Sequence, residues 1–334
     1  LELLSVLIEA VGHVGEDIKT LNLAAKELKS LHGLIEYCPE VEELDVSNNA
    51  LTQLDGIPST TCHSLCAKSN QLDDVTYFGH LTDLEYLDVS ENSLTDLDGL
   101  ADLHRLKELE CATNGLAFVD FRDTPFPCLE VLDLSKNKIT QVAGLDALPN
   151  LTSLTLDSNR LPSILDFLPV MPFLETLSLR SCSIETIPSD LHTRLPALRT
   201  LVFDGNAIAD IRPLSHMPSL EHLSLAGCQV SRLRQTVFTF RHMEDLISLD
   251  LRSNPLTHGF YECAGSEGTV AKRTVDGEIA VRRTVYEVLL AGCLRRKGVT
   301  VDGNVLVEKD RSGIWERLIE LDVVGKEMVR TEQQ

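Results

Sequence analysis

Basic residues are scarce in this sequence. Its 334 residues include 30 Lys and Arg against 51 Asp and Glu, which gives a formal net charge of -21. The shortage lies in the first part of the chain: residues 1–269 hold 18 basic and 40 acidic side chains, whereas residues 270–334 hold 12 and 11. Because proteins bind nucleic acid mainly through Lys and Arg that displace phosphate counterions, this balance argues against nucleic-acid binding.

Long hydrophobic runs are also missing. No stretch reaches the roughly 18–20 apolar residues of a membrane-spanning helix, so we expect no insertion into a membrane. The beginning of the chain, LELLSVLIEAVG, contains Glu2 and Glu9 and lacks a basic leader, so it does not match a secretory signal peptide. The chain starts at Leu1 instead of Met, which suggests a fragment of a longer polypeptide.

Motifs of enzymes and metal sites are absent as well. No CxxC pair occurs among the nine dispersed cysteines, several of which lie in apolar patterns, so we expect buried thiols in the reducing cytosol or nucleus. The motifs GxxxxGK[ST], HExxH and GxSxG do not occur, which predicts no enzymatic activity and no cofactor. The nearest approaches to a metal cluster are His222 with Cys228, and His63 with Cys62 and Cys66. We expect no metal there, because core-filling or solvent-facing roles explain such residues.

A repeat of the form LxxLxLxxNxL organises the chain. Clear copies are VEELDVSNNAL, LEYLDVSENSL and LEVLDLSKNKI. The pattern is that of a leucine-rich-repeat (LRR) array, which predicts an α/β solenoid: a horseshoe of about eleven repeats with short parallel strands on its concave face. The leucines that align at the strand centres are Leu21, Leu44, Leu65, Leu87, Leu109, Leu132, Leu154, Leu177, Leu201, Leu223 and Leu249.

Asparagine recurs where the chain turns after each strand. A buried amide there can bond backbone groups that have no strand partner, so stacked asparagines should form a ladder. The other slots hold Lys26, Cys182 and Cys228, and cysteine suits the position as a small buried substitute. The ladder consists of Asn49, Asn70, Asn92, Asn114, Asn137, Asn159, Asn206 and Asn254.

The spacing of about 22 residues leaves room only for short return segments, so we expect 3₁₀ or single-turn helices there, with residues 51–57 and 94–100 as examples. The two ends of a stack need caps. We predict an N-terminal cap helix at 1–17, the repeat array at 18–256, a long loop at 257–278, and a C-terminal cap with a terminal helix at 279–334.

The caps are predicted from their periodicity. Apolar residues recur on one helical face in each cap, and VTVDGNVLV at 299–307 reads as one closing strand. A last amphipathic segment begins near Ser312 and carries the only tryptophan, Trp315. The apolar faces consist of Leu4, Leu7, Ile8 and Val11 at the N-terminus and of Val281, Val285, Val288 and Leu289 at the C-terminus.

Candidate binding residues flank the strand leucines, because these positions project from the strand face. The first half carries an acidic stripe that contains one aromatic residue: Glu43, Asp45, Glu85, Tyr86, Asp88, Glu108, Glu110 and Asp133. The second half is neutral to mildly basic and offers Arg180, Arg199, His222 and Arg252. The acidic stripe can dock a basic partner segment with Tyr86 as an anchor, or it can serve only solubility and edge protection. If the stripe is the docking site, we expect charge reversal at Asp45, Asp88 and Asp133 together to weaken the partner and to leave folding intact.

Some segments resemble one family more closely than a generic array. They are LIEYCPEVEELDVSNNALTQLDGIPST, FGHLTDLEYLDVSENSLTDLDGL, and LDLRSNPLTHGFYE followed by VRRTVYEVLL. They resemble the C-terminal LRR module of the fungal spindle-pole-body scaffolds of the septation initiation (mitotic exit) network, which are relatives of centriolin. The likeness spans most of residues 15–310. The closing VTVDG departs from the usual Leu-x-x-Leu-Asp-Gly ending of LRR caps.

This resemblance implies a non-enzymatic scaffold in the cytoplasm and cytoskeleton, at the spindle pole body. Its partners would be a coiled-coil anchor of the pole body and, through the scaffold, a small GTPase and kinases that time mitotic exit, septation and cytokinesis. It also implies that a long N-terminal region is absent. It transfers no individual contact residue, and the oligomeric state stays open. Two alternatives remain: a generic cytoplasmic LRR subunit of a phosphatase or dynein-type complex, and an LRR subunit of a nuclear RNA–protein complex.

Overall fold

Short strands centred on the aligned leucines build the fold. The computed structural model describes residues 2–15, 17–58, 60–122, 126–260, 282–283, 285–287, 290, 294 and 299–305. The chain forms two compact units, and their boundary falls inside the predicted array. Unit 1 comprises Leu1–Ile184 with Thr193–Ala197, and unit 2 comprises Glu185–His192 with Leu198–Gln334.

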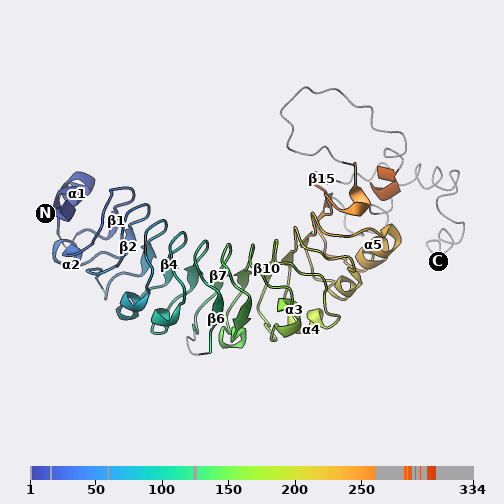
Figure 1. The fold of residues 1–334 in the computed structure, drawn as a ribbon, viewed down its shortest axis with the longest axis horizontal. Helices are drawn as coiled ribbons and strands as arrows, with labels where there is room; N and C mark the ends of the chain where they lie inside the picture. Colours follow the sequence, from blue (N-terminus) through green and yellow to red (C-terminus); the bar gives the residue numbers. More distant parts are fainter. Residues whose placement is uncertain are drawn as a thin grey trace, which may run out of the picture. The chain divides into compact units, whose positions relative to one another are not determined.

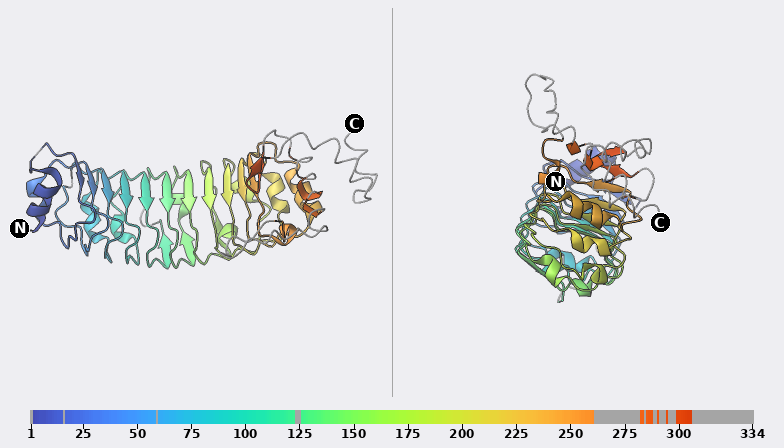
Figure 2. Two further views of the ribbon diagram at one scale, coloured as in Figure 1. Left: turned by 90° about the horizontal axis from the view of Figure 1, so that it is seen from above. Right: turned by 90° about the vertical axis from the view of Figure 1, so that its right-hand side faces the viewer.

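In unit 1 the strands are parallel, and each pairs with the strand of the next repeat (Figures 1 and 2). The register pairs Leu21 with Leu44 and continues leucine to leucine as far as Leu177. These leucines are buried, which confirms the predicted LRR solenoid. The strands are β1 (Thr20–Asn22), β2 (Glu43–Asp45), β3 (Ser64–Cys66), β4 (Tyr86–Asp88), β5 (Glu108–Glu110), β7 (Val131–Asp133), β9 (Ser153–Thr155) and β10 (Thr176–Ser178).

Unit 2 continues the same pattern with β11 (Thr200–Val202), β12 (His222–Ser224) and β13 (Ser248–Asp250), followed by β14 (Thr300–Val301) and β15 (Asn304–Val305). Strand β14 runs parallel to β13 and places Val301 opposite Leu249, whereas β15 is antiparallel to β14. The prediction of one closing strand at 299–307 was therefore wrong. Asp302 and Gly303 both have positive φ, the conformation that an Asp-Gly pair adopts in a two-residue hairpin turn.

Return segments connect the strands through short helices, which lie on the side away from the strands (Figure 1). As predicted, most have three to five residues, although residues 51–57 form no helix and 94–100 ends in one. The short helices are α2 (Leu34–Tyr37), η1 (Thr76–His80), η2 (Asp98–Leu100), η3 (Leu145–Ala147), α3 (Ile164–Phe167), α4 (Leu191–Arg194), η4 (Arg212–His216) and η5 (Pro255–Thr257).

Three return segments differ from the prediction. Helix α5 (Leu233–Phe240) has eight residues, because 26 residues separate Leu223 from Leu249 and the return is longer there. In unit 1, β6 (Phe118–Asp120) and β8 (Gln141–Ala143) form a second, two-stranded parallel sheet instead of helices. Three-residue strands of this kind carry no periodic signal that sequence analysis could detect.

The N-terminal helix α1 spans Glu2–Val11 and is followed by Gly12 in a left-handed conformation, so it is shorter than the predicted 1–17. It buries Leu3 and Leu7, one helical turn apart, whereas Ile8 is 52% exposed. Including Ile8 in the buried face was therefore wrong.

The asparagine ladder is confirmed. The amide nitrogen of Asn49 donates to the carbonyl oxygens of Leu23 and Val46, at 2.9 Å each, and its amide oxygen accepts from the backbone N–H of Leu28 at 2.9 Å. Asn70, Asn92, Asn114, Asn137 and Asn159 repeat this arrangement, which joins each repeat to the one before it.

Cysteine replaces the asparagine donor in two slots. The thiols of Cys182 and Cys228 lie 3.2 and 3.3 Å from the carbonyl oxygens of Leu156 and Phe203. Burial raises the pKa of both thiols to about 11, so they are protonated and able to donate. A thiol cannot reproduce the acceptor role of the amide oxygen as well, since sulfur is a weak acceptor.

At the C-terminal end, residues 282–283 and 285–287 are helical, and Val285 is buried as predicted. Tyr286 was not predicted, yet it is almost completely buried and donates its hydroxyl to Asp302 at 2.6 Å. Asp302 in turn accepts from the backbone N–H of Leu251 at 2.6 Å, so this hydrogen-bond chain ties the helix to the hairpin and to the last repeat. Several predicted features lie outside the described residues: Val281, Val288, Leu289, most of the 257–278 loop, and the terminal segment with Ser312 and Trp315.

Candidate protein-binding surface

The predicted acidic residues lie on the strand face of unit 1, in two rows. The third strand positions carry Asp45, Asp88, Glu110 and Asp133, which the register aligns across β2 to β7 with Cys66 between the first two. Neighbouring strands are about 4.8 Å apart, so the side chains of this acidic row lie close together. The first strand positions carry Glu43, Tyr86 and Glu108.

Three aspartates of the acidic row have a structural role that the sequence analysis missed. The Oδ1 atoms of Asp45, Asp88 and Asp133 accept from the backbone N–H of the serine two residues later, at 2.9, 2.8 and 2.7 Å. Each carboxylate thereby caps the turn that leaves its strand. These caps argue against the expectation that charge reversal at the three aspartates leaves folding intact, which stays a prediction, and the recurring LDxS pattern was the signal for this role.

Asp88 is also covered by its neighbours. Only 5% of its surface is exposed, and the Cys66 thiol lies 3.9 Å from its Oδ2. Listing it among residues that face a partner was wrong, since the side chains of adjacent strands cover the carboxylate. The partly buried Cys66 thiol has a raised pKa, chiefly because of burial, with a further contribution from Asp88.

Glu110 is the member of the acidic row that caps no turn. Its carboxylate accepts from the hydroxyl of Tyr86 at 3.5 Å and lies between Asp88 and Asp133 on the adjacent strands. Partial burial, followed by repulsion from these two carboxylates, raises the pKa of Glu110. Burial, followed by the nearby charges of Glu110 and Asp88, also raises the pKa of Tyr86, so its hydroxyl stays a donor. The centre of the acidic row therefore holds negative charge that Lys68 and the Tyr86 hydroxyl relieve only in part.

We expect Glu110→Gln to stabilise the protein at pH 7 by about 0.2–1 kcal/mol, the cost of like charges on adjacent strands. Glu110 has a higher pKa in the folded chain than in the unfolded chain, so ionisation weakens the wild type as the pH rises through that interval. Below the ordinary glutamate pKa of about 4.3, Glu110 is neutral in the folded and in the unfolded chain, so the advantage of glutamine should vanish. Urea unfolding at pH 7 and near pH 4 measures the difference.

Glu108→Gln is the matched control, because Glu108 is exposed on the same strand. Two results would contradict the claim that Glu110 is repelled by its neighbours. One is a stability difference between Glu110→Gln and wild type that does not change with pH, and the other is a variant less stable than wild type at pH 7.

The remaining residues of the acidic stripe differ in availability. Glu43 and Glu108 are exposed, and Tyr86 is half-buried. Glu85 precedes β4, and its carboxylate binds Lys107 on the next repeat at 2.7 Å, which lowers the pKa of Glu85. Glu85, one of the predicted contact residues, therefore has its charge neutralised by Lys107.

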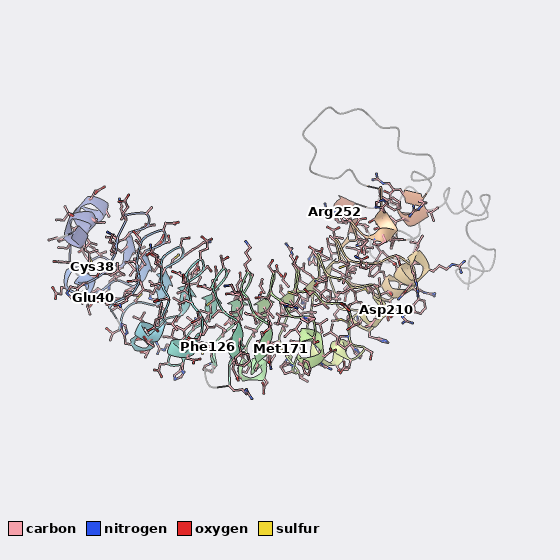
Figure 3. All side chains as sticks on the ribbon, in the orientation of Figure 1. Cys38, Glu40, Phe126, Met171, Asp210 and Arg252 are labelled. Atoms are coloured by element: carbon pink, nitrogen blue, oxygen red, sulfur yellow. The ribbon has the colours of Figure 1, made fainter. Side chains whose placement is uncertain are left out.

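The predicted basic residues are also balanced by carboxylates. The guanidinium of Arg199 lies 2.6 Å from Glu221 in unit 2, and that of Arg252, labelled in Figure 3, lies 3.0 Å from Asp250. In unit 1, Arg180 lies 3.8 Å from Asp157, whereas His222 of unit 2 is exposed. These pairs leave the arginine positions close to neutral, at the neutral end of the prediction, and the partners Asp157 and Glu221 come from neighbouring repeats that the sequence analysis did not pair.

The residues near Cys62 and Cys228 do not assemble into a metal site. Across the part of the chain that the structure describes, no three His, Cys, Asp or Glu side chains are placed to share one metal ion. Burial raises the pKa of Cys62 to about 11, which keeps that thiol protonated. The same described residues include no helix whose length and apolar character would let it cross a bilayer.

Comparison with known proteins agrees with this geometry. Residues 172–230 match the family described as "Leucine rich repeat", and residues 129–169 match "Leucine Rich repeats (2 copies)". Over 85 residues the chain is 31% identical to the septation initiation network scaffold protein cdc11 of Schizosaccharomyces pombe. That match covers 25% of this chain and only 8% of the length of the scaffold protein.

Solved structures share the fold. An internalin (inlF) of Listeria monocytogenes superposes with a TM-score of 0.65 at 21% identity, covering 76% of this chain and 82% of the internalin chain. The LRR ectodomain of the receptor kinase GASSHO1/SCHENGEN3 of Arabidopsis thaliana gives a TM-score of 0.51 at 21% identity, covering 72% of this chain and 33% of that one. The fold is an LRR solenoid, a fold typical of protein-interaction modules.

Proposed function

We propose that this LRR solenoid is a non-enzymatic scaffold module of the septation initiation network, located at the spindle pole body. The observation that carries the proposal is the 85-residue match, at 31% identity, to the S. pombe network scaffold. The resemblance of the capping and turn segments to that scaffold family supports it. In this role the chain binds a coiled-coil component of the pole body and thereby helps to gather a small GTPase and kinases that control mitotic exit and cytokinesis.

A solenoid suits such a role because its binding surfaces are fixed before the partner arrives. The asparagine ladder joins successive repeats and the capped turns fix the chain where it leaves each strand, so little conformational entropy is lost on docking. A scaffold acts by raising the effective concentration of its clients, which requires binding and no chemistry of its own. We assign the partner's basic segment to the acidic strand face, defined as Glu43, Asp45, Tyr86, Glu108, Glu110 and Asp133.

Localisation tests the proposal most directly. A fluorescently tagged copy expressed in dividing cells should coincide with a spindle-pole marker during mitosis. Cross-linking of mitotic cells followed by mass spectrometry should recover pole-body proteins. Recovery of phosphatase or dynein subunits alone would favour a generic cytoplasmic regulator, and recovery of spliceosomal subunits alone would favour a nuclear RNA–protein complex. Either result would exclude the pole-body assignment.

The acidic strand face is tested by removing charge without removing the turn caps. In the triple variant Asp45→Asn, Glu108→Gln and Asp133→Asn, asparagine keeps the Oδ1 acceptor that each cap needs. We expect the affinity for a basic partner segment to fall by about 1–3 kcal/mol with no loss of folding stability. Titration of the pole-body protein recovered above, by isothermal calorimetry, measures the loss.

The matched control changes three exposed aspartates of return segments: Asp73→Asn, Asp96→Asn and Asp146→Asn. It has the same net charge as the triple variant but leaves the strand face intact. Equal losses in the two variants would mean that net charge alone matters, and the strand face would be excluded as the docking site.

A further inference from the structure

Three large apolar side chains are exposed within seven residues of unit 1. Phe167, Val170 and Phe173 are 79%, 64% and 58% exposed. The residues that follow them, Leu168, Met171 and Leu174, are buried with the same spacing of three, so one face of this segment packs into unit 1 and the other meets solvent. Single exposed apolar residues are ordinary, but a cluster of this kind marks an interaction site.

The backbone beneath these side chains is held in place. Arg194 donates from its guanidinium to the carbonyl oxygens of Leu165 and Asp166, both at 2.9 Å, and its own carbonyl accepts from the N–H of Met171 at 2.8 Å. Met171, labelled in Figure 3, is itself buried. The exposed side chains therefore project from a fixed platform, which lowers the entropic cost of binding.

A hollow of about 320 Å³ lies beside Phe173. Glu130, Thr152 and Glu175 line it, and each immediately precedes a strand, β7, β9 or β10. Glu130 and Glu175 are therefore two strand spacings apart, about 10 Å. Asn150 and Ala197 complete the lining with the Phe173 ring.

The two carboxylates are the open polar groups of the hollow. The side-chain amide of Asn150 donates to the carbonyl oxygen of Pro127 at 2.7 Å. The hydroxyl of Thr152 donates to the backbone carbonyl oxygen of Glu130 at 3.0 Å. Glu130 and Glu175 are exposed, and neither forms an ion pair with any residue that the structure describes. A lysine or arginine fits this setting, because its aliphatic stem can pack on Phe173 while its charged head lies between the carboxylates.

We propose that Phe167, Val170 and Phe173, with Glu130 and Glu175, form a docking surface, here named the flank surface, for a helix of a partner protein. That helix carries an apolar stripe bordered by Lys and Arg. Phe167, Val170 and Phe173 follow one another at intervals of three residues, so neighbours in this set are at most about 10 Å apart along the chain. An α-helix repeats each heptad position every 10.5 Å or so, which matches that interval. One apolar stripe of a helix can therefore contact all three side chains. The inference is separate from the acidic strand face and holds wherever in the cell the chain acts.

A pair of synthetic peptides tests the flank surface. The first is a fluorescein-labelled amphipathic helix with leucine at the a and d positions and lysine at the bordering positions. The second has glutamate in place of every lysine. Fluorescence anisotropy with the whole chain should show binding of the lysine peptide and at least about tenfold weaker binding of the glutamate peptide. Equal binding of the two peptides would overturn the proposal.

Variants then locate the site. Phe167→Ser, Val170→Ser and Phe173→Ser together should weaken the lysine peptide about tenfold or more, because apolar anchors dominate such interfaces. Glu130→Gln with Glu175→Gln should weaken it by a smaller factor, about threefold to tenfold, and reduce its salt dependence. The double variant changes only exposed carboxylates, so it keeps the test valid if the triple serine variant folds poorly.

Matched controls are Ile35→Ser and Phe118→Ser, at apolar residues of unit 1 that are 46% and 47% exposed. They should bind the lysine peptide as the wild type does. Losses equal to those of the flank variants, or a loss confined to the acidic strand face variant, would overturn the assignment. Sedimentation gives a further check: self-association of the wild type that the serine variant abolishes would make a second copy the occupant and would also refute the proposal.

Discussion

Asn137→Ala should lower the free energy of unfolding by about 3–5 kcal/mol, because it removes the acceptor of two buried backbone N–H groups and one of the donors to each of two carbonyls. The amide nitrogen of Asn137 donates to the carbonyl oxygens of Cys111 and Leu134 at 2.9 and 3.0 Å. Its amide oxygen accepts from the backbone N–H groups of Asn114 and Leu116 at 3.1 and 3.2 Å. Alanine can make none of these bonds, and Asn137 is buried, so solvent is a poor replacement for its amide.

Urea unfolding followed by circular dichroism measures this effect. Asn150→Ala is the matched control, since Asn150 is exposed and donates a single bond to the carbonyl of Pro127. Asn137→Cys should fall between the two, because a thiol can donate as Cys182 does at the equivalent slot but accepts poorly. An Asn137→Ala variant as stable as Asn150→Ala would refute the structural role of the ladder.

Leu132→Ala should cost about 2–5 kcal/mol, the range found when a buried leucine is truncated and leaves a cavity. Leu132 is 1% exposed and pairs in register with Leu109 and Leu154 on the two adjacent strands. Neighbouring repeats meet at this point, so the cavity weakens both repeat interfaces. A thermal melt compared with wild type measures the loss.

The Leu132→Ala effect should also be local. Amide hydrogen exchange should quicken first in β5, β7 and β9, because each repeat contacts mainly its neighbours. Leu132→Ile, which conserves volume, is the control and should cost less than about 1.5 kcal/mol. A melt of Leu132→Ala indistinguishable from wild type would show that the leucine does not face the core.

The repeat pattern predicted the elements that depend on local chemistry. The strand-centre leucines occupy equivalent positions because every repeat buries the same strand position against its neighbours. The observed register pairs these leucines as the alignment of the repeats predicts. The same holds for the ladder asparagines and for cysteine as their substitute at position 182. These predictions were correct because the same residue types recur at the same position in most repeats.

Features that arise once were not predicted. The closing hairpin depends on a single Asp302–Gly303 turn, and α5 depends on a few extra residues in one return segment. The prediction for the candidate surface was wrong at Asp88 for a related reason. The alternation of the strand predicted an exposed side chain, but only 5% of Asp88 is exposed in the folded chain. Exposure depends on the size and charge of neighbours, which the alternation of one strand does not encode.

The sequence by itself determined that this chain is a stack of leucine-rich repeats with a hydrogen-bonded ladder and an acidic excess in the repeats, since these follow from periodicity and composition. Only the tertiary structure decided which charges are available to a partner. Glu85, Arg199 and Asp157 meet partners some 22 or 23 residues away in sequence, because stacking brings consecutive repeats to within one strand spacing. Stacking also left Phe167, Val170 and Phe173 exposed and placed Phe173 beside Glu130 and Glu175, two carboxylates that form no ion pair with any described residue, a juxtaposition that no single repeat contains.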